Sequence, residues 1–216
     1  MAYVIMWRMS KPIPHKKTKA ILFDLGNVIL DFDFTPAFRK LSGASRRPAE
    51  EIKAFFFASG LEVLYDGGKI SSRQFYAHVK KELKHGLDYT EFKKIWNEIF
   101  TLNREIANLI ERLRPHYRLV LISNTNAMHY EHARLKYPVL RHFDQKILSF
   151  KEKVRKPDER IYRKAIRACR AAAGEIFYID DREDLTEAAS ALGLKTFTYK
   201  NNVKALTKKM KKAGIL

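Results

Sequence analysis

Residues 19–33 read KAILFDLGNVILDFD, and this stretch decides the fold. Its apolar run, residues 20–23, has the length and composition of a buried parallel strand, and one carboxylate, Asp24, follows it in a turn that contains Gly26 and Asn27. A buried parallel strand presents reactive groups at its carboxyl end, where open α/β sheets bind ligands. The alternative is an aspartate that merely ends a strand. The interpretation therefore depends on whether the rest of the chain supplies partners for Asp24.

The composition is that of a globular protein. A chain of 216 residues, of which 46% are hydrophobic, suits one α/β domain or a core with a small insert. The single cysteine, Cys169, excludes a disulfide framework and favours a reducing compartment, so we expect a cytoplasmic protein. No apolar run approaches the roughly 20 residues that span a bilayer, so no membrane partner is expected. Residues 1–18 are expected to form a mobile basic arm.

The charge is strongly positive, with 42 Lys and Arg against 24 Asp and Glu and a net charge of +18. Such a surface attracts polyanions and speeds the approach of phosphorylated substrates. The basic residues are spread along the chain, however, and no nucleic-acid-binding motif accompanies them. We therefore expect no specific nucleic-acid binding, and the pattern indicates no particular oligomeric state.

A block of helix signals follows the first strand. Residues 35–103 show apolar positions at helical spacing and no strand pattern. Four segments carry the signal, at residues 37–41, at 47–58, from Ser71 onward and from Thr90 onward. The run from Tyr65 to Lys69 is expected to be a turn-rich loop that faces the site. The block predicts an all-helical cap at residues 34–103.

The second half of the chain alternates between strands and helices. Strands are predicted at residues 118–122, 146–150, 176–179 and 195–199, and helices at 104–113, from 127, at 159–173, at 186–192 and at 203–212. This alternation predicts an α/β fold with a Rossmann-like parallel sheet and helices on both faces. Its core would comprise residues 19–33 and 104–216. The helical cap is inserted after the first strand, where it would cover Asp24.

Polar clusters follow the predicted strands or lie in adjacent loops. They are Asp24, residues 123–126, residues 155–157, and the pair Asp180 and Asp181. The carboxyl ends of parallel strands lie together, so these clusters are expected at one edge of the sheet.

This collection suits phosphoryl transfer, which needs an in-line nucleophile, hydrogen-bond donors and positive charge. Asp24 can be the nucleophile, Ser123 a donor and Lys156 the cation. Two adjacent carboxylates are costly without positive charge, and hard oxygen ligands suit Mg²⁺. Asp24, the carbonyl of Gly26 and Asp181 would form a plausible ligand shell with waters.

The chain resembles the haloacid dehalogenase superfamily of phosphohydrolases over nearly its whole length. Four motifs carry the resemblance, in order and each at a predicted strand end or an adjacent loop: FDLGNV at residues 23–28, ISN at 122–124, RKP at 155–157 and IDD at 179–181. The helical insert is similar to the early cap of that superfamily. The run FDLGNVI is similar to sugar-phosphate phosphatases that act on α-D-glucose 1-phosphate.

The resemblance implies a role for each matching residue. Asp24 would form an aspartyl-phosphate, and Asp24, the Gly26 carbonyl and Asp181 would bind Mg²⁺. Asp180 would be a neighbouring ligand or a support for the ligands. The phosphate group is expected to contact Gly26, Asn27, Ser123, Asn124 and Lys156. For Asn124 and Asn126 a simple turn-forming role stays open.

Two positions depart from the family's pattern. Gly26 stands where the family's phosphatases usually carry a second aspartate that acts as general acid and base, a role worth roughly 10²- to 10⁴-fold in rate. Asp31 or Asp33 are candidates for supplying that proton, although both also read as solvent-facing turn residues. Leu185 stands where Asn or Asp is usual, directly after Asp184. The orientation of Asp181 and of Lys156 is therefore in question.

Three functions are compatible with these residues. The first is a Mg²⁺-dependent phosphatase that acts on a small phosphorylated metabolite. The second is a metal-free 2-haloacid dehalogenase that uses the same aspartate, which the paired carboxylates oppose. The third is a weak or inactive family member that serves as an anion-binding module. Specificity would reside in the cap, for which the candidates are Tyr65, Asp66, Lys69, Arg73 and Trp96.

Overall fold

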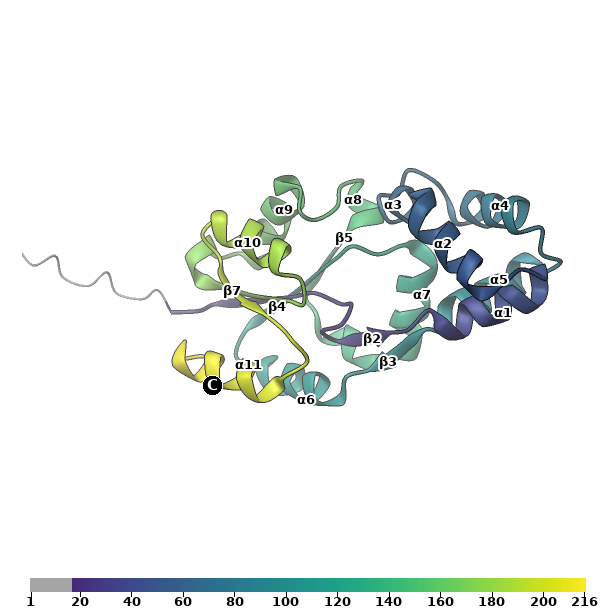
Figure 1. Cartoon of the computed structure of the whole chain (residues 1–216). Helices are drawn as coiled ribbons and strands as arrows, with labels where there is room; N and C mark the ends of the chain where they lie inside the picture. The colour runs from purple at the N-terminus through teal and green to yellow at the C-terminus, as the bar shows by residue number, and fades with distance from the viewer. Residues whose placement is uncertain (1–16) are drawn as a thin grey trace, which may run out of the picture.

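The computed structural model describes residues 17–216, and a five-stranded parallel sheet forms its centre (Figure 1). The strands are β1 (Ala20–Phe23), β4 (Arg118–Ser123), β5 (Gln145–Leu148), β6 (Ile176–Asp180) and β7 (Lys195–Thr198). Their order is β5-β4-β1-β6-β7, so β1 lies in the middle. Phe23 pairs with Leu121 of β4 and Ile179 of β6, which brings the ends of all three strands to one edge.

Helices cover both faces of the sheet. α6 (Arg104–Leu113), α7 (Ala127–Lys136) and α11 (Val203–Lys212) pack on one face, and α9 (Glu159–Cys169) and α10 (Glu183–Ala191) on the other. The residues of β1 alternate between the two resulting cores: Ile21 and Phe23 belong to one, and Ala20 and Leu22 to the other. All four are fully buried, as a central parallel strand requires. The predicted α/β class and doubly covered parallel sheet are confirmed.

The insert is a bundle of short helices. They are α1 (Thr35–Ser45), α2 (Ala49–Ser59), α3 (Leu61–Asp66), α4 (Ser72–Leu83) and α5 (Tyr89–Asn97). The bundle has its own aromatic core, in which the buried Trp96 packs against Phe56 and Phe75. Capping boxes at Ser71 and Asp88 start α4 and α5, because each side chain accepts a hydrogen bond from the third residue of its helix. The aromatic stripe is thus the core of the cap.

The prediction of a strand-free segment over residues 35–103 is wrong. β2 (Leu30–Phe32) and β3 (Phe100–Leu102) form an antiparallel pair at the base of the cap, so the insert follows β2. Three-residue strands are too short for an alternating pattern to stand out beside a helical one. We propose that the domain boundaries lie between residues 33 and 34 and between residues 103 and 104, as expected. The antiparallel pair then joins β2 of the core to β3 of the cap.

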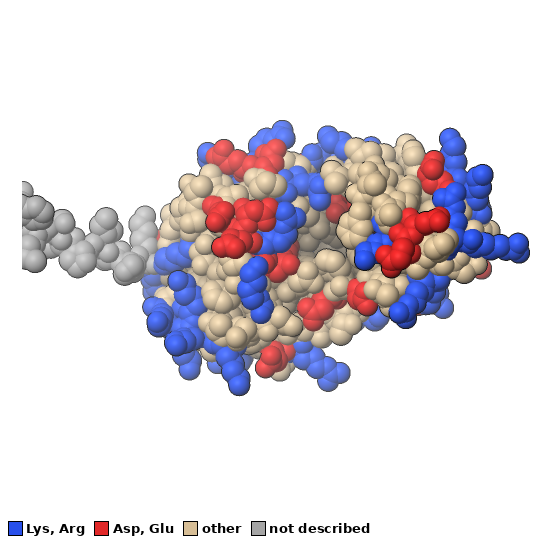
Figure 2. Space-filling model, in the orientation of Figure 1, with Lys and Arg blue, Asp and Glu red and all other residues tan. Residues whose placement is uncertain are grey.

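Several further boundaries differ from those predicted, and two of these differences lie near the junction of core and cap. Tyr65 and Asp66 end helix α3 rather than opening a loop, and the strand expected at residues 146–150 ends at Leu148, where Ser149 starts α8 (Ser149–Glu152). The expected basic arm lies almost wholly outside the described residues. Across residues 17–216, no helix is both long and apolar enough to cross a membrane. Figure 2 shows Lys and Arg side chains over both core and cap on the face drawn.

Candidate active site

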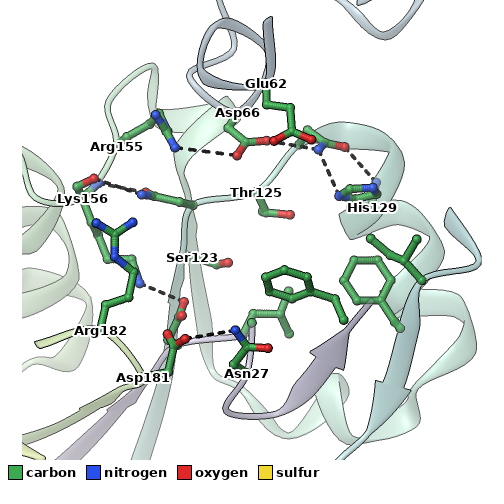
Figure 3. A pocket seen from close by; sticks show the side chains of 18 of the residues that line it. Asn27, Glu62, Asp66, Ser123, Thr125, His129, Arg155, Lys156, Asp181 and Arg182 are labelled. Carbon is green, nitrogen blue, oxygen red and sulfur yellow. Dashed lines mark hydrogen bonds and ion pairs between the residues drawn. The ribbon is translucent and has the colours of Figure 1, made fainter. Parts of the chain in front are cut away.

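A cavity of about 420 Å³ lies between the carboxyl edge of the sheet and the cap. Figure 2 shows the hollow from outside, and Figure 3 shows its side chains. The core contributes its strand-end residues, and the cap contributes α2 and α3. The residues that line the cavity include Asp24, Gly26, Asn27, Phe32, Phe57, Glu62, Asp66, Ser123, Asn124, His129, Arg155, Lys156, Asp181, Arg182 and Leu185. The strand-end clusters that the sequence predicts therefore meet at one place.

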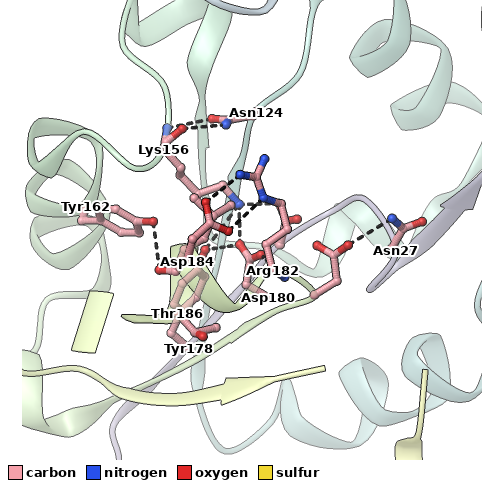
Figure 4. A network of polar contacts seen from close by, with 12 residues as sticks. Asn27, Asn124, Lys156, Tyr162, Tyr178, Asp180, Arg182, Asp184 and Thr186 are labelled. Atoms are coloured by element: carbon pink, nitrogen blue, oxygen red, sulfur yellow. Dashed lines mark hydrogen bonds and ion pairs between the residues drawn. The ribbon is translucent and has the colours of Figure 1, made fainter. Parts of the chain in front are cut away.

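Asp24 and Lys156 form the buried centre of the site. Asp24 continues β1, because its backbone N–H donates to the carbonyl of Ile179 at 2.9 Å. The Lys156 ammonium lies 2.8 Å from Asp24 Oδ1. It also lies 2.6 Å from Asp180 Oδ2 (Figure 4). Burial lowers the pKa of Lys156, but Asp24 and Asp180 outweigh that effect and hold it above its ordinary value. Lys156 therefore stays charged beside the candidate nucleophile.

Asp180 is held by donors from the protein itself. Its Oδ2 accepts hydrogen bonds from Lys156 and from the Tyr178 hydroxyl, and its Oδ1 accepts from the backbone N–H of Arg182 at 3.0 Å. The Tyr178 hydroxyl also lies 3.3 Å from Lys156 Nζ. Sequence reasoning did not identify Tyr178 as a residue of the site. Its position two residues before Asp180 on one strand, and thus on the same face, is the signal that could have identified it.

Asp181 is positioned by the turn after β1. The Asn27 side-chain amide donates to Asp181 Oδ2 at 3.0 Å. Asn27 has a φ of 51°, a left-handed conformation that asparagine tolerates better than most residues. Burial raises the pKa of Asp181, although the hydrogen bond from Asn27 opposes the rise. One carboxylate oxygen of Asp181 is left to face the cavity.

The carboxylates of Asp24, Asp180 and Asp181 form a donor set that fits a divalent cation. One oxygen atom from each lies within 4.8 Å of the others. Burial raises the pKa of Asp24 to about 7, and Asp180 adds to the rise while Lys156 opposes it. Three carboxylates facing the one ammonium group of Lys156 leave excess negative charge, which a hard cation such as Mg²⁺ would balance. The oxygens of Asp180 already have protein donors, so Asp24 and Asp181 suit direct ligation and Asp180 a supporting position.

Ser123 and Asn124 follow β4 but make different contacts. Ser123 is only 2% exposed and lines the cavity, and its hydroxyl has no protein hydrogen bond within residues 17–216. Asn124 uses both ends of its amide on Lys156: Oδ1 accepts from the Lys156 N–H at 2.8 Å, and Nδ2 donates to its carbonyl at 2.9 Å. Asn124 thus positions the lysine, and its contact with phosphate stays a prediction.

The hydrogen bonds of Asn27 to Asp181 and of Asn124 to Lys156 take the place of the contacts expected from the fourth motif. Leu185 is buried at the edge of the cavity, and the Asp184 carboxylate pairs with Arg182 at 2.6 Å. Neither residue hydrogen-bonds to Lys156 or Asp181 in the described part of the chain. The two functional side chains are oriented instead from the first and second motifs, by Asn27 and Asn124.

The space beside Gly26 is filled by an aromatic ring. A Cβ atom at Gly26 would lie 3.0 Å from Phe32 Cε1, so a longer side chain meets Phe32 there. Asp31 precedes Phe32 on β2, and Asp33 directly follows the strand. Neither aspartate lines the cavity. Asp33 is exposed and accepts a hydrogen bond from the Thr35 N–H at 2.8 Å. Asp31 and Asp33 are thus not placed to supply the proton in this structure, because side chains alternate along a strand and Phe32, between them, is the one that lines the cavity.

The cap reaches the cavity through α3. Asp66 Oδ1 accepts from the Asn126 side chain at 3.1 Å, and Asp66 Oδ2 lies 3.9 Å from Arg155. The hydroxyl of Ser149 donates to the Asp66 carbonyl at 2.6 Å, which ties the end of α3 to the core. Of the five specificity candidates, only Asp66 lines the cavity. Trp96 and Tyr65 are buried in the cap, and Lys69 and Arg73 lie outside the cavity.

His129 is a buried cavity residue that sequence reasoning missed. Its Nδ1 accepts from the Asn126 amide at 3.1 Å, and its Nε2 donates to the Trp96 carbonyl at 3.1 Å, which fits the neutral ring. Burial lowers the pKa of His129 to about 3. The ring joins core helix α7 to cap helix α5 and carries no charge near neutral pH.

The comparisons with known proteins identify the family and agree with the fold. The family model of haloacid dehalogenase-like hydrolases matches residues 18–193. A haloacid dehalogenase family enzyme of Bacteroides thetaiotaomicron, solved in complex with magnesium and inorganic phosphate, is 24% identical, with a TM-score of 0.80 over 88% of this chain and 98% of its own. A predicted hydrolase of the same kind from Porphyromonas gingivalis is 24% identical, with a TM-score of 0.78 over 90% and 98%. A haloacid dehalogenase phosphatase from Thermococcus onnurineus is 20% identical, with a TM-score of 0.62 over 86% and 87%. The chain therefore belongs to the haloacid dehalogenase-like hydrolases.

Proposed function

We propose that the protein is a Mg²⁺-dependent phosphatase that hydrolyses a small phosphorylated metabolite through an aspartyl-phosphate on Asp24. One observation carries this proposal: Asp24 lies at the base of the cavity, 2.8 Å from the buried ammonium of Lys156, with Asp181 beside it. A nucleophile, a fixed cation and a divalent-cation site at one strand edge are the parts that phosphoryl transfer requires. The Bacteroides relative that binds magnesium and phosphate supports the same assignment.

Each residue has a distinct task in this reaction. The carboxylate of Asp24 attacks phosphorus in line with the leaving oxygen, and the ammonium of Lys156 balances the negative charge of the phosphoryl oxygens. The Ser123 hydroxyl, which faces the cavity, donates a hydrogen bond to one of these oxygens. Bound to Asp24, the Gly26 carbonyl and Asp181, Mg²⁺ would supply further positive charge at the phosphoryl group.

The cavity favours a sugar phosphate or a compound of similar size. Its volume of about 420 Å³ admits a small metabolite and excludes large ones. Phe32 and Phe57 offer apolar ring surface, and Asp66 and Arg155 offer hydrogen-bond partners to hydroxyl groups. The likeness of the first motif to α-D-glucose 1-phosphate phosphatases agrees with this choice.

The dehalogenase alternative is less well supported. A reaction without metal leaves three clustered carboxylates, and among residues 17–216 Lys156 is the only cation that forms an ion pair with any of them, so their burial is costly. The assembled site also favours a working catalyst over an inactive anion-binding module.

The test is phosphate release from a panel of phosphorylated metabolites with Mg²⁺ and with a chelator. We expect Mg²⁺-dependent release by the wild type and none by Asp24→Asn. Asp31→Asn is the matched control, because Asp31 lies on β2 outside the cavity. Phosphate release that survives in Asp24→Asn would refute the proposal, and halide release from a 2-haloacid in chelator would support the dehalogenase instead.

A further inference from the structure

The site as described lacks a proton donor for the leaving group. Gly26 has no side chain to serve, and Phe32 occupies the space beside it. Asp24 attacks from the sheet edge, and in-line displacement places the leaving oxygen on the opposite side of phosphorus. A replacement donor must therefore come from the cap side of the cavity.

The titratable side chains on the cavity wall are mostly committed to other partners. Asp24, Asp181 and Lys156 form the charge centre near the sheet edge. Both ring nitrogens of His129 are bonded to Asn126 and Trp96. One oxygen of Asp66 accepts a hydrogen bond from Asn126, and the other faces Arg155.

Glu62 differs from all of these groups. Its carboxylate lines the cavity and has no hydrogen bond or ion pair to any residue in the described range 17–216. Figure 3 shows Glu62 and Asp66 across the cavity from Asn27 and Asp181. Because Ser149 ties the end of α3 to the core, Glu62, one helical turn earlier, is held over the cavity.

The surroundings of Glu62 favour its protonated form. Burial, and then the neighbouring Asp66, raise its pKa to about 7, and Arg155 opposes the rise. A general acid and base works best when its pKa lies near the operating pH. Glu62 can therefore hold a proton before the leaving group departs and accept one afterwards.

We propose that Glu62 is the general acid and base of the reaction, supplied by the cap in place of the aspartate that the first motif lacks. The proposal rests on the phosphatase function proposed above. It also narrows the substrate class to phosphate monoesters whose leaving group is a poor one, such as a sugar hydroxyl, because such groups require protonation as they depart.

The steps balance as follows. Asp24 Oδ forms a bond to phosphorus as the bond from phosphorus to the leaving oxygen breaks, and the proton of the Glu62 carboxyl passes to that oxygen and releases an alcohol. The Glu62 carboxylate then takes a proton from a water molecule whose oxygen attacks phosphorus. The bond to Asp24 breaks, inorganic phosphate is formed, and both carboxyl groups return to their starting states.

The test compares Glu62→Gln with the wild type in the first turnover, on an alkyl phosphate and on 4-nitrophenyl phosphate. The nitrophenolate leaves without a proton, so we expect release of the leaving group to slow by about 10²-fold or more for the alkyl ester and by less than about tenfold for the aryl ester. Glu62→Asp should restore part of the alkyl rate. Glu50→Gln, a neutralisation on the exposed surface of α2, is the matched control and should change neither rate.

The outcomes separate this proposal from the function on which it rests. An unchanged alkyl rate in Glu62→Gln, or equal slowing of both esters in a variant that melts at the wild-type temperature, would overturn the role of Glu62 alone. A wild type without Mg²⁺-dependent phosphate release, or an active Asp24→Asn variant, would instead overturn the phosphatase assignment.

Discussion

Replacing Asp24 with asparagine should make the metal-free protein more stable while abolishing its activity. In the folded chain Asp24 is 7% exposed, and burial raises its pKa from 3.8 to about 7. Above pH 7 the folded protein therefore carries an ionised carboxylate that would be more stable in the unfolded chain. Asparagine keeps the shape of the side chain and removes that charge.

The size of the effect follows from the pKa change. A rise from 3.8 to about 7 corresponds to roughly 4 kcal/mol of destabilisation at pH 8. Relaxation around the charge reduces this figure, so we expect Asp24→Asn to gain about 2–4 kcal/mol, or at least roughly 4 °C in melting temperature. The sign follows from linkage: the penalty is complete above pH 7, shrinks as the pH falls toward 3.8, and at pH 5 is less than half as large.

Calorimetry in a chelator at pH 8 and pH 5 measures this gain. The difference between wild type and variant is the quantity to compare, because the other titrating groups cancel in it. Asp31→Asn should show no such gain, and adding Mg²⁺ should stabilise the wild type more than Asp24→Asn. An Asp24→Asn protein that is no more stable than the wild type at pH 8, or a gain that is equal at both pH values, would refute the charge argument.

Three other substitutions have definite outcomes. The pKa of His129 is about 3 in the folded protein and near 6.5 in the unfolded chain, so acidification from pH 7 to 5 should lower the free energy of unfolding by about 2 kcal/mol through this residue. In urea denaturation at the two pH values, His129→Gln should lose this contribution to the pH dependence. Gly68→Ala should destabilise the protein by more than about 1 kcal/mol in urea denaturation, since its Cβ would lie 2.1 Å from the Phe150 carbonyl at a φ of 61°. Gly26→Ala should lower kcat by displacing the Phe32 ring, and a second change, Phe32→Ala, should restore part of the loss in the same assay.

The parallel sheet and the meeting of its strand ends could be predicted from the sequence. Buried strands such as residues 20–23 are continuous apolar runs, and the geometry of parallel sheets then brings Asp24, Ser123 and Asp181 to one edge. The pair β2 and β3 could not be predicted, because three residues carry too little pattern and the pairing joins residues far apart in the chain.

The cap side of the site was the least predictable part. Glu62 stands on a six-residue helix, and its place on the cavity wall follows only from how α3 packs against the core. His129 reads as an ordinary helix residue until its contacts with α5 are known. Trp96 was proposed for specificity, but a large aromatic side chain stabilises the cap by burial instead.

The most direct test of the central claim is to detect a phosphoryl group on Asp24. The wild type is mixed with Mg²⁺ and a substrate found in the panel, quenched in acid during turnover and digested, and the peptide that contains residues 19–33 is analysed by mass spectrometry. We predict that this peptide carries one phosphoryl group, located on Asp24, and that the modification disappears when substrate is exhausted. Steady turnover with the peptide unmodified at every quench time, or a phosphoryl group on another residue, would contradict the account.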